Sequence, residues 1–195
     1  TVESVTEGHP DKVCDQIADA LLDAYLTHDP NSRVALEVFG SHGALMIGGE
    51  VTSGAEIDPV RIAKKVYKEI GYDDALEVFT NIEEQSPDIA QGVETGGAGD
   101  QGIMYGYASS ETPEFLPRAV VLAHKLAYGL ANLRRHNSQF DFLRPDGKTQ
   151  VTIEGGRVVT VVVSTQHADD TPQSHIKKML ISNLIQPTIG DIDGV

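Results

Sequence analysis

Apolar residues recur at helical intervals in two stretches of the first half of the chain. The first stretch begins at Pro10 and the second at Pro59, and proline is well tolerated at a first helical position because that N–H has no partner within the helix. One apolar stripe on each stretch predicts an amphipathic helix, and Gly71 predicts the end of the second. The stripes consist of Val13, Ile17, Leu21 and Ala24 in the first helix and of Val60, Ala63, Val66 and Ile70 in the second.

The segment between these helices alternates apolar and polar residues with a period of two. The alternation runs through residues 33–40, and a second β-rich run covers residues 44–51. Because residues 41–43 are all that separates the two runs, they predict a β-hairpin. A short strand is expected at residues 77–82. The predicted order of the first half is therefore helix, hairpin, helix, strand.

The second half is predicted to follow a related order. Residues 103–108 alternate as a strand does, and a long helix with its own apolar stripe follows Pro117. Arg134 and Arg135 are expected in its last turn, where cations suit the negative end of the helix dipole.

A second hairpin and a last helix complete this half. Residues 150–154 and 157–164 flank a two-glycine turn at 155–156, which tolerates the positive φ angles that a tight hairpin needs. The last helix is expected to begin after Pro172 and to stop before Pro187, since proline interrupts a helix interior.

These two orders predict an α+β fold with repeated helix–hairpin–helix domains, in which helices pack on one face of mostly antiparallel sheets. We expect an N-terminal domain over residues 1–90 and a middle domain over residues 91–195. Residues 83–102, rich in Gly, Pro and polar side chains, are predicted to link them. A loop loaded with polar groups is also a good place to seek a site.

The net charge of the chain argues against two classes of binding partner. Among 195 residues, 29 are acidic and 15 basic, which gives a formal net charge of −14. This argues against nucleic acid and against an anionic membrane as partners, because both require basic surface. The single Cys14 rules out an internal disulfide and favours a reducing compartment. Since no apolar run approaches the ~20 residues of a membrane span, we expect a cytoplasmic protein.

A glycine-rich segment at residues 97–102 fits the G-x-G-x-x-G spacing of dinucleotide-binding loops. That loop requires a strand before it and a helix after it. Here the following residues predict a strand, and Asp100 would repel a phosphate, so we reject this interpretation. The sequence contains no G-x-x-x-x-G-K-[ST] loop either.

Residues 7–12, Glu-Gly-His-Pro-Asp-Lys, form the densest group of chemically useful side chains. One interpretation is an ordinary helix start with an acid in its first turn. The other is a binding site, in which His9, Asp11 and Lys12 converge on the positive end of a helix. That arrangement suits a polyphosphate with bound magnesium, because Asp supplies an oxygen ligand while His and Lys donate hydrogen bonds.

Other candidates are weaker by themselves. Arg-Pro-Asp-Gly-Lys at residues 144–148 is a strong turn signal, so a plain connecting turn is an alternative to a site. Glu37 and Glu50 fall in predicted strands, where a solvated face competes with a functional cavity. Residues 85–92 are expected to form a polar loop without metal-ligand spacing. No histidines have the H-E-x-x-H spacing of zinc hydrolases.

Taken in order, five motifs of this chain resemble the S-adenosylmethionine synthetase (methionine adenosyltransferase) family, whose subunit has three related α+β domains. The motifs extend from the first residues to beyond residue 150. They are ESVTEGHPDK at 3–12, GGE at 48–50, QSPDIAQG at 85–92, GAGDQG at 97–102 and RPDGKTQVT at 144–152.

The resemblance implies a reaction in which the methionine sulfur attacks C5′ of ATP and expels triphosphate, which is then hydrolysed to phosphate and pyrophosphate. His9 would stabilise the charge that develops near the departing O5′. Asp11 would bind Mg²⁺, and Glu37 would bind K⁺. Glu50, Gln91 and Asp100 match positions of the methionine pocket, and the positions that match ATP contacts are His9, Asp146, Gly147 and Lys148.

In this family the site lies between two facing subunits, so the resemblance implies a homodimer or a dimer of dimers with shared active sites. The family's third domain, which adds phosphate contacts, is expected to be absent from this chain, and the lid at residues 92–96 is short. One alternative is therefore a non-catalytic fragment that binds nucleotide, methionine or a partner. Another is a metal-dependent phosphohydrolase that uses Asp11 and Lys148 but neither Glu50 nor Gln91. We expect the 195 residues alone to form no S-adenosylmethionine.

Overall fold

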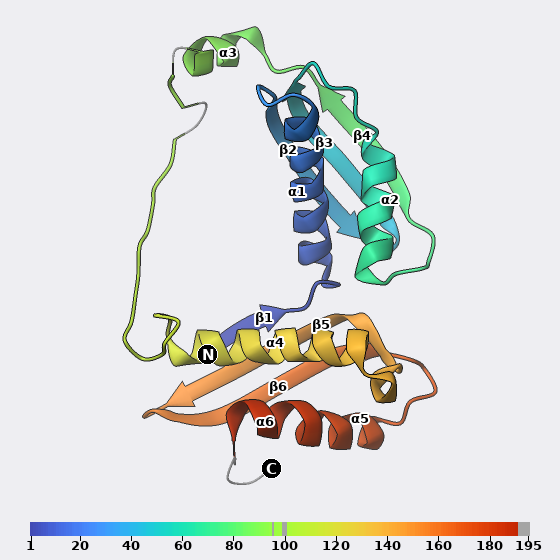
Figure 1. Ribbon diagram of the computed structural model, residues 1–195, viewed down its shortest axis with the longest axis vertical. Helices are drawn as coiled ribbons and strands as arrows, with labels where there is room; N and C mark the ends of the chain where they lie inside the picture. The colour runs from blue at the N-terminus through green and yellow to red at the C-terminus, as the bar shows by residue number, and fades with distance from the viewer. Residues whose placement is uncertain (95, 99–100, 191–195) are drawn as a thin grey trace. The chain divides into compact units, whose positions relative to one another are not determined.

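The computed structural model describes residues 1–94, 96–98 and 101–190, and the chain divides into two compact units (Figure 1). Unit 1 combines Thr1–Lys12 with the chain from Tyr107 onward, and unit 2 comprises Val13–Gly106. Each unit holds helices and a three-stranded sheet. Both strand pairs of unit 1 are antiparallel, whereas unit 2 has one antiparallel and one parallel pair. The α+β class is therefore confirmed. The division at residue 90 and the relation of the two domains as copies of one another stay predictions.

Unit 2 is built on a sheet of order β2-β3-β4. β2 (Arg33–Ser41) and β3 (Ala44–Thr52) form the predicted antiparallel hairpin, while β4 (Glu77–Glu83) runs parallel to β3. α1 (Pro10–His28), whose body from Val13 belongs to this unit, and α2 (Pro59–Ile70) cover one face of the sheet (Figure 1). α2 connects β3 to β4 as a crossover helix.

Local signals set the ends of α2, and apolar burial fixes both helices to the sheet. The Asp58 carboxylate accepts a hydrogen bond from the Arg61 N–H at 3.0 Å, and Gly71 ends the helix in the left-handed region at φ 116°. The helices and one sheet face share a core whose buried members are Val13, Ile17, Leu21, Leu45, Ile47, Ala63 and Ile70.

The other face of this sheet carries an exposed apolar row. Phe39, Met46 and Phe79 are aligned across the three strands and are 72%, 47% and 49% exposed. Glu37 and Glu50 lie on this same face, because Glu50 pairs with Ala35, two residues before Glu37. The face is therefore apolar near the β2–β3 turn and acidic farther along the strands.

Unit 1 is built on an antiparallel sheet of order β1-β5-β6. β1 (Val2–Val5) pairs with β5 (Leu143–Glu154), which forms the predicted hairpin with β6 (Arg157–His167). The turn residues Gly155 and Gly156 have φ angles of 55° and 81°, as a tight hairpin turn requires.

Helices pack on the sheet of unit 1. α4 (Arg118–His136) contacts β1 and β5, and a short 3₁₀ turn, η1 (Ser138–Phe140), follows it. The last helical segment comprises α5 (Gln173–Leu180), the π-helical turn η2 (Ile181–Ile185) and α6 (Gln186–Ile189). The buried core is Leu122, Ala123, Leu126, Leu130, Phe140, Leu143, Val151, Ile176, Leu180 and Leu184.

Two predictions for the segment between the hairpins are wrong. Residues 103–108 form no strand, and Ile103, Met104 and Tyr105 are 80%, 89% and 91% exposed. Alternation gives a strand only where a neighbouring strand completes the hydrogen bonds. Residues 85–92, predicted as a loop, instead enter α3 (Pro87–Glu94), whose first residue is a proline as helix starts allow.

Two predictions in unit 1 are also wrong. Residues 144–148 form part of β5 rather than a turn, with a register irregularity between Leu143 and Gly147. Pro145 is accommodated there because an irregular stretch of strand spares the ladder bond that proline cannot donate. The last helix does not stop before Pro187, which occupies the first turn of α6, where a missing N–H costs little.

Among the described helices, none combines the length and the apolar character needed to cross a bilayer.

Candidate functional site

Strand pairing in unit 1 joins two motifs that are far apart in the sequence. β1 pairs with β5 so that Val5 lies opposite Lys148. Just beyond the strand, the Thr6 N–H donates to the Gly147 carbonyl at 2.9 Å, and the Thr6 hydroxyl donates to the Pro145 carbonyl at 2.7 Å. Thr6 is only 5% exposed, so these bonds lie in a protected environment. The segment that follows β1 is therefore held against residues 145–147.

Two glycines allow this close approach. A Cβ atom on Gly8 would collide with the backbone of Pro145. A Cβ atom on Gly147 would lie 2.7 Å from Leu130 Cδ2 and 3.1 Å from Thr6 Cγ2. A side chain at position 8 would push the two motifs apart, so packing requires glycine there, whereas a side chain at position 147 would require Leu130 of α4 and Thr6 to shift.

An ion-pair cluster fixes the start of the same loop. Glu7 Oε1 accepts hydrogen bonds from Arg134 Nη2 at 2.5 Å and from Arg135 Nε at 2.8 Å, both at the end of α4. Burial would raise the pKa of Glu7, but the bonds from Arg135 and Arg134 outweigh it and hold the pKa below its ordinary value of 4.5. Bonding to Glu7 raises the pKa of Arg135 in turn. This cluster ties the loop to the end of α4.

His9 lies at the start of α1 with its side chain 20% exposed. Its backbone N–H donates to the Thr6 carbonyl at 3.1 Å, which closes the tight turn from β1 into the helix. The Asp11 N–H donates to His9 Nδ1 at 3.3 Å. A neutral ring that accepts at Nδ1 carries its proton on Nε2, so His9 is left with an N–H donor for a ligand.

The charged residues of the two motifs are exposed or half-buried. The Asp11 side chain is 89% exposed, and its Oδ2 lies 3.9 Å from His9 Nδ1. Lys148, on the paired strand, is 48% exposed and lies 3.9 Å from the Glu3 carboxylate. Asp146 is half-buried in the irregular part of β5. A histidine, a lysine and two aspartates thus project from adjoining segments of unit 1.

The chemistry of this group suits a polyphosphate with magnesium. Asp11 offers an exposed oxygen donor, and magnesium usually takes one or two protein carboxylates together with waters and phosphate oxygens. Within the described residues, no three His, Cys, Asp or Glu side chains gather as a ready-made metal cage.

The remaining predicted residues belong to unit 2 or fall outside the description. Glu37 is exposed and Glu50 half-buried on the open face of the β2-β3-β4 sheet. Gln91 is exposed on α3. Asp100 lies outside the described residues. The structure therefore places His9, Asp11, Asp146, Gly147 and Lys148 on adjoining segments of unit 1, and Glu37 and Glu50 on one sheet face of unit 2.

Sequence reasoning missed the residues that hold the unit 1 group in place. Arg134 and Arg135 were explained by the helix dipole, and Glu7 by an ordinary helix start. Thr6 received no role, and β1 itself was not predicted. Two adjacent arginines at a helix end, in a chain with few cations, were the signal that could have pointed to a half-buried acidic partner.

Comparisons with family models and with curated proteins identify the same family. The model of the S-adenosylmethionine synthetase N-terminal domain matches residues 1–87, and the model of its central domain matches residues 95–193. An S-adenosylmethionine synthase of Nostoc punctiforme is 47% identical over 99% of this chain and 54% of its own length.

Two further relatives carry the same name. The protein of Thermosynechococcus vestitus is 46% identical over 97% of this chain and 54% of its own length, and that of Staphylococcus epidermidis is 44% identical over the same two shares. The chain spans about half the length of the curated relatives it matches. With its N-terminal and central regions both matched, the chain belongs to the S-adenosylmethionine synthetase family.

Proposed function

We propose that this chain supplies the substrate-binding groups for S-adenosylmethionine synthesis from ATP and methionine. The observation that carries the proposal is the pairing of β1 with β5, which sets the loop at His9 beside residues 146–148. Because the chain spans about half the length of its relatives, the activity is proposed for the chain acting with the remainder of such a protein.

In the proposed reaction, the methionine sulfur attacks C5′ of ATP, the C5′–O5′ bond breaks, and triphosphate leaves. Negative charge then develops on O5′ and on the phosphates. A donor at His9 Nε2 is suited to stabilise that charge, since it needs no proton transfer before it can act. Lys148 supplies a positive charge from the adjoining strand, and Asp146 and Gly147 complete the ATP contacts.

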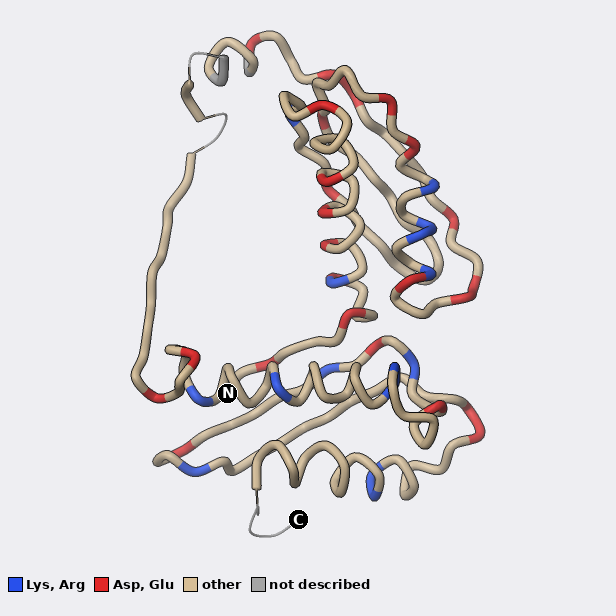
Figure 2. The backbone as a smooth tube through the Cα atoms, in the orientation of Figure 1, with Lys and Arg blue, Asp and Glu red and all other residues tan. Residues whose placement is uncertain are grey.

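Metal ions would complete the charge balance. Asp11 would hold Mg²⁺, which neutralises phosphate oxygens as they gain charge, and Glu37 would hold K⁺. Bound cations would be needed because the chain, with a net charge of −14, would otherwise repel an anionic triphosphate. Acidic residues lie along α1 and in the loops of unit 2 (Figure 2). With 15 basic against 29 acidic residues, the chain has few Lys and Arg side chains to balance the charge of a triphosphate.

Methionine would be bound by Glu50, Gln91 and Asp100. We further propose that two copies of the chain face each other to form shared sites, as a homodimer or dimer of dimers. The exposed row of Phe39, Met46 and Phe79 supports this, because monomers rarely leave such an apolar row open on a sheet face. Glu50 lies on that face and would then sit near the subunit boundary.

Binding and product formation test the proposal separately. The 195-residue chain is titrated calorimetrically with a non-hydrolysable ATP analogue and Mg²⁺, in the wild-type, Lys148→Ala and Lys125→Ala forms. Lys125 is a matched control, because it is 56% exposed and pairs with Glu114 elsewhere on unit 1. We expect weaker binding only in Lys148→Ala.

The chain is then incubated with ATP, methionine, Mg²⁺ and K⁺, and the products are identified by mass spectrometry. We expect no S-adenosylmethionine from the chain alone and its formation when the remaining part of a relative is added. Phosphate release that does not depend on methionine would support the phosphohydrolase alternative instead. Analogue binding with no product under any addition would support the non-catalytic alternative.

A further inference from the structure

The loop of residues 6–9, which leads from β1 into α1, is attached to two different elements of unit 1. On one side it lies against β5, because Thr6 donates hydrogen bonds to backbone carbonyls of that strand and Gly8 has no room for a Cβ atom beside Pro145. Between these two residues, Glu7 pairs with the end of α4. Successive residues of the loop are thus held by a strand and by a helix in turn.

The attachment to α4 consists of charge-assisted hydrogen bonds. A single oxygen of Glu7, Oε1, accepts from Nη2 of Arg134 and from Nε of Arg135, in the last turn of the helix. Charged hydrogen bonds are shorter and stronger than neutral ones, and Arg134 is only 13% exposed, so solvent screens its bond little. Because two donors converge on one oxygen, the carboxylate cannot move far without losing one of them.

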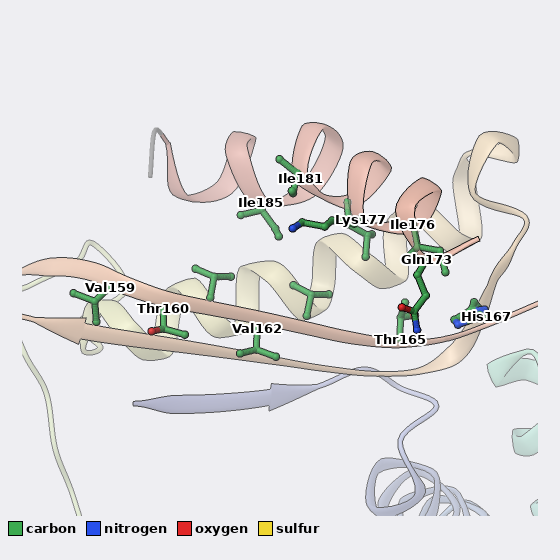
Figure 3. Close-up of a pocket in the computed structure, with 13 residues that line it drawn as sticks. Val159, Thr160, Val162, Thr165, His167, Gln173, Ile176, Lys177, Ile181 and Ile185 are labelled. Atoms are coloured by element: carbon green, nitrogen blue, oxygen red, sulfur yellow. The ribbon is translucent and has the colours of Figure 1, made fainter. Parts of the chain in front are cut away.

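His9, two residues beyond Glu7, is fixed more loosely by its own contacts. The Asp11 N–H donates to His9 Nδ1 at 3.3 Å, which is longer than the usual hydrogen bond of about 2.7–3.2 Å. The cavity of about 660 Å³ in unit 1 lies along β6 and the last helical segment, and no residue of the loop lines it (Figure 3). The walls of that cavity therefore do not orient the ring, which depends on how the loop is attached.

We propose that Glu7, held by Arg134 and Arg135, is a positioning residue for the reaction, because it fixes the direction in which the His9 Nε2–H points. The inference rests on the proposed function, in which His9 donates to the charge that develops at O5′. Such a donor lowers the barrier only if it is aimed before the charge appears. A misplacement of about 1 Å can reduce a rate by about 100-fold. Glu7 acts through His9 and needs no contact with the substrate.

NMR of the 195-residue chain with ¹⁵N-labelled histidine measures the state of the His9 ring directly. Spectra are recorded at pH 8, where an ordinary imidazole is neutral, and the His9 signals are assigned with a His9→Asn variant. In the wild type we expect one tautomer, with the proton on Nε2. In Glu7→Gln we expect the two tautomers to average and the order parameter of the ring to fall. Only folded molecules give these signals, so a loss of stability by itself does not change them.

Two further variants control this measurement. Glu114→Gln removes a carboxylate that pairs with Lys125 of α4 at 2.9 Å, away from the loop, and should leave the His9 signals unchanged. Arg135→Gln removes only the more exposed of the two arginines, and should change the His9 signals in the same direction as Glu7→Gln but by less. Circular dichroism checks that each variant folds, and Arg135→Gln decides the question if Glu7→Gln does not.

Kinetics in a full-length protein of the family that contains this chain test the consequence for the reaction. Glu7→Gln should lower kcat at least tenfold and change KM for ATP and for methionine by less than about threefold. A donor to charge that develops in the transition state affects kcat and kcat/KM together, whereas lost substrate binding would raise KM. Glu114→Gln should keep kcat within about twofold of the wild type. All assays are made at a temperature at which circular dichroism shows every variant folded.

The two measurements separate failure of this inference from failure of the proposed function. Unchanged His9 signals in Glu7→Gln and Arg135→Gln would overturn the inference and leave the proposed function standing. Changed signals with an unchanged kcat would overturn it as well, because His9 would then not be the donor that the proposed function assigns. A raised KM with an unchanged kcat would also contradict it, since Glu7 would then serve substrate binding.

Discussion

Replacing Glu7 by glutamine removes the carboxylate charge that pairs with Arg134 and Arg135 and leaves the shape of the side chain almost unchanged. Glu7 and Arg134 are only 25% and 13% exposed, so their pair is shielded from solvent. A hydrogen bond to a charged group is worth about 1.5–3 kcal/mol. The bond to Arg135, which is 37% exposed, adds less because solvent screens it. Since glutamine retains one acceptor, we expect the free energy of unfolding to fall by about 2 kcal/mol.

The loss should depend on pH in a defined direction. The folded pKa of Glu7 is lower than its ordinary value of 4.5, so the carboxylate contributes stability that is fully present above pH 4.5. That contribution disappears as the pH falls through the folded pKa, because the protonated side chain no longer pairs as a charge. The variant has no such group. The difference between wild type and Glu7→Gln should therefore be constant near pH 7 and shrink below pH 4.5.

Urea unfolding followed by circular dichroism measures both effects, with the linear extrapolation applied at each pH from 7 to 3. Glu114→Gln is the matched control, because its pair with Lys125 lies at the surface of the same unit and is 41% and 56% exposed. We expect no resolvable change in that control. A loss in Glu7→Gln no larger than in Glu114→Gln, or a difference that persists unchanged at pH 3, would refute the role given to the cluster.

Four further outcomes are expected. In a full-length protein of the family that contains this chain, Lys148→Ala should lower kcat/KM by about 30- to 1,000-fold, equivalent to ~2–4 kcal/mol of lost electrostatic stabilisation. Unchanged turnover would show that residues 144–148 have a purely structural role. Asp11→Asn should raise the Mg²⁺ concentration needed for activity with little change in Tm; earlier melting with an unchanged Mg²⁺ requirement would contradict the ligand role. Gly8→Ala should destabilise the fold by about 1–3 kcal/mol in urea unfolding, because its Cβ collides with the facing strand, while Gly92→Ala, with open space around it, serves as control. Burial and the hydrogen-bonded Asp74 carboxylate raise the pKa of Tyr67 to about 12, so the unfolded chain releases this proton at a lower pH than the folded chain does. The wild-type protein should therefore lose free energy of unfolding between pH 10 and 12, and Tyr67→Phe should not lose this contribution. Parallel plots of unfolding free energy against pH for the two proteins would contradict this.

The sequence alone determined the elements whose signals are local. α2 was predicted with both of its ends, because a proline, the Asp58 cap and Gly71 act within a few residues of the chain. The two hairpins followed equally from alternation and from short turns, with Gly155-Gly156 supplying the positive φ angles. The motifs of the candidate site were also readable in the sequence, but only as separate groups.

Tertiary structure decided which of these segments meet. β1 pairs Val2 with Val151, which lies far along the chain. No local pattern indicates which strand edge a four-residue strand will pair with. The strand predicted at residues 103–108 was wrong for the same reason, because the sequence does not show whether a neighbouring strand is present to pair with it. Strand pairing depends on hydrogen-bond partners that are distant in sequence, whereas helix caps and turns satisfy their own bonds nearby. The placement of the loop that carries His9 beside the strand that carries Lys148, and the Glu7 cluster that ties this loop to α4, therefore came from the fold.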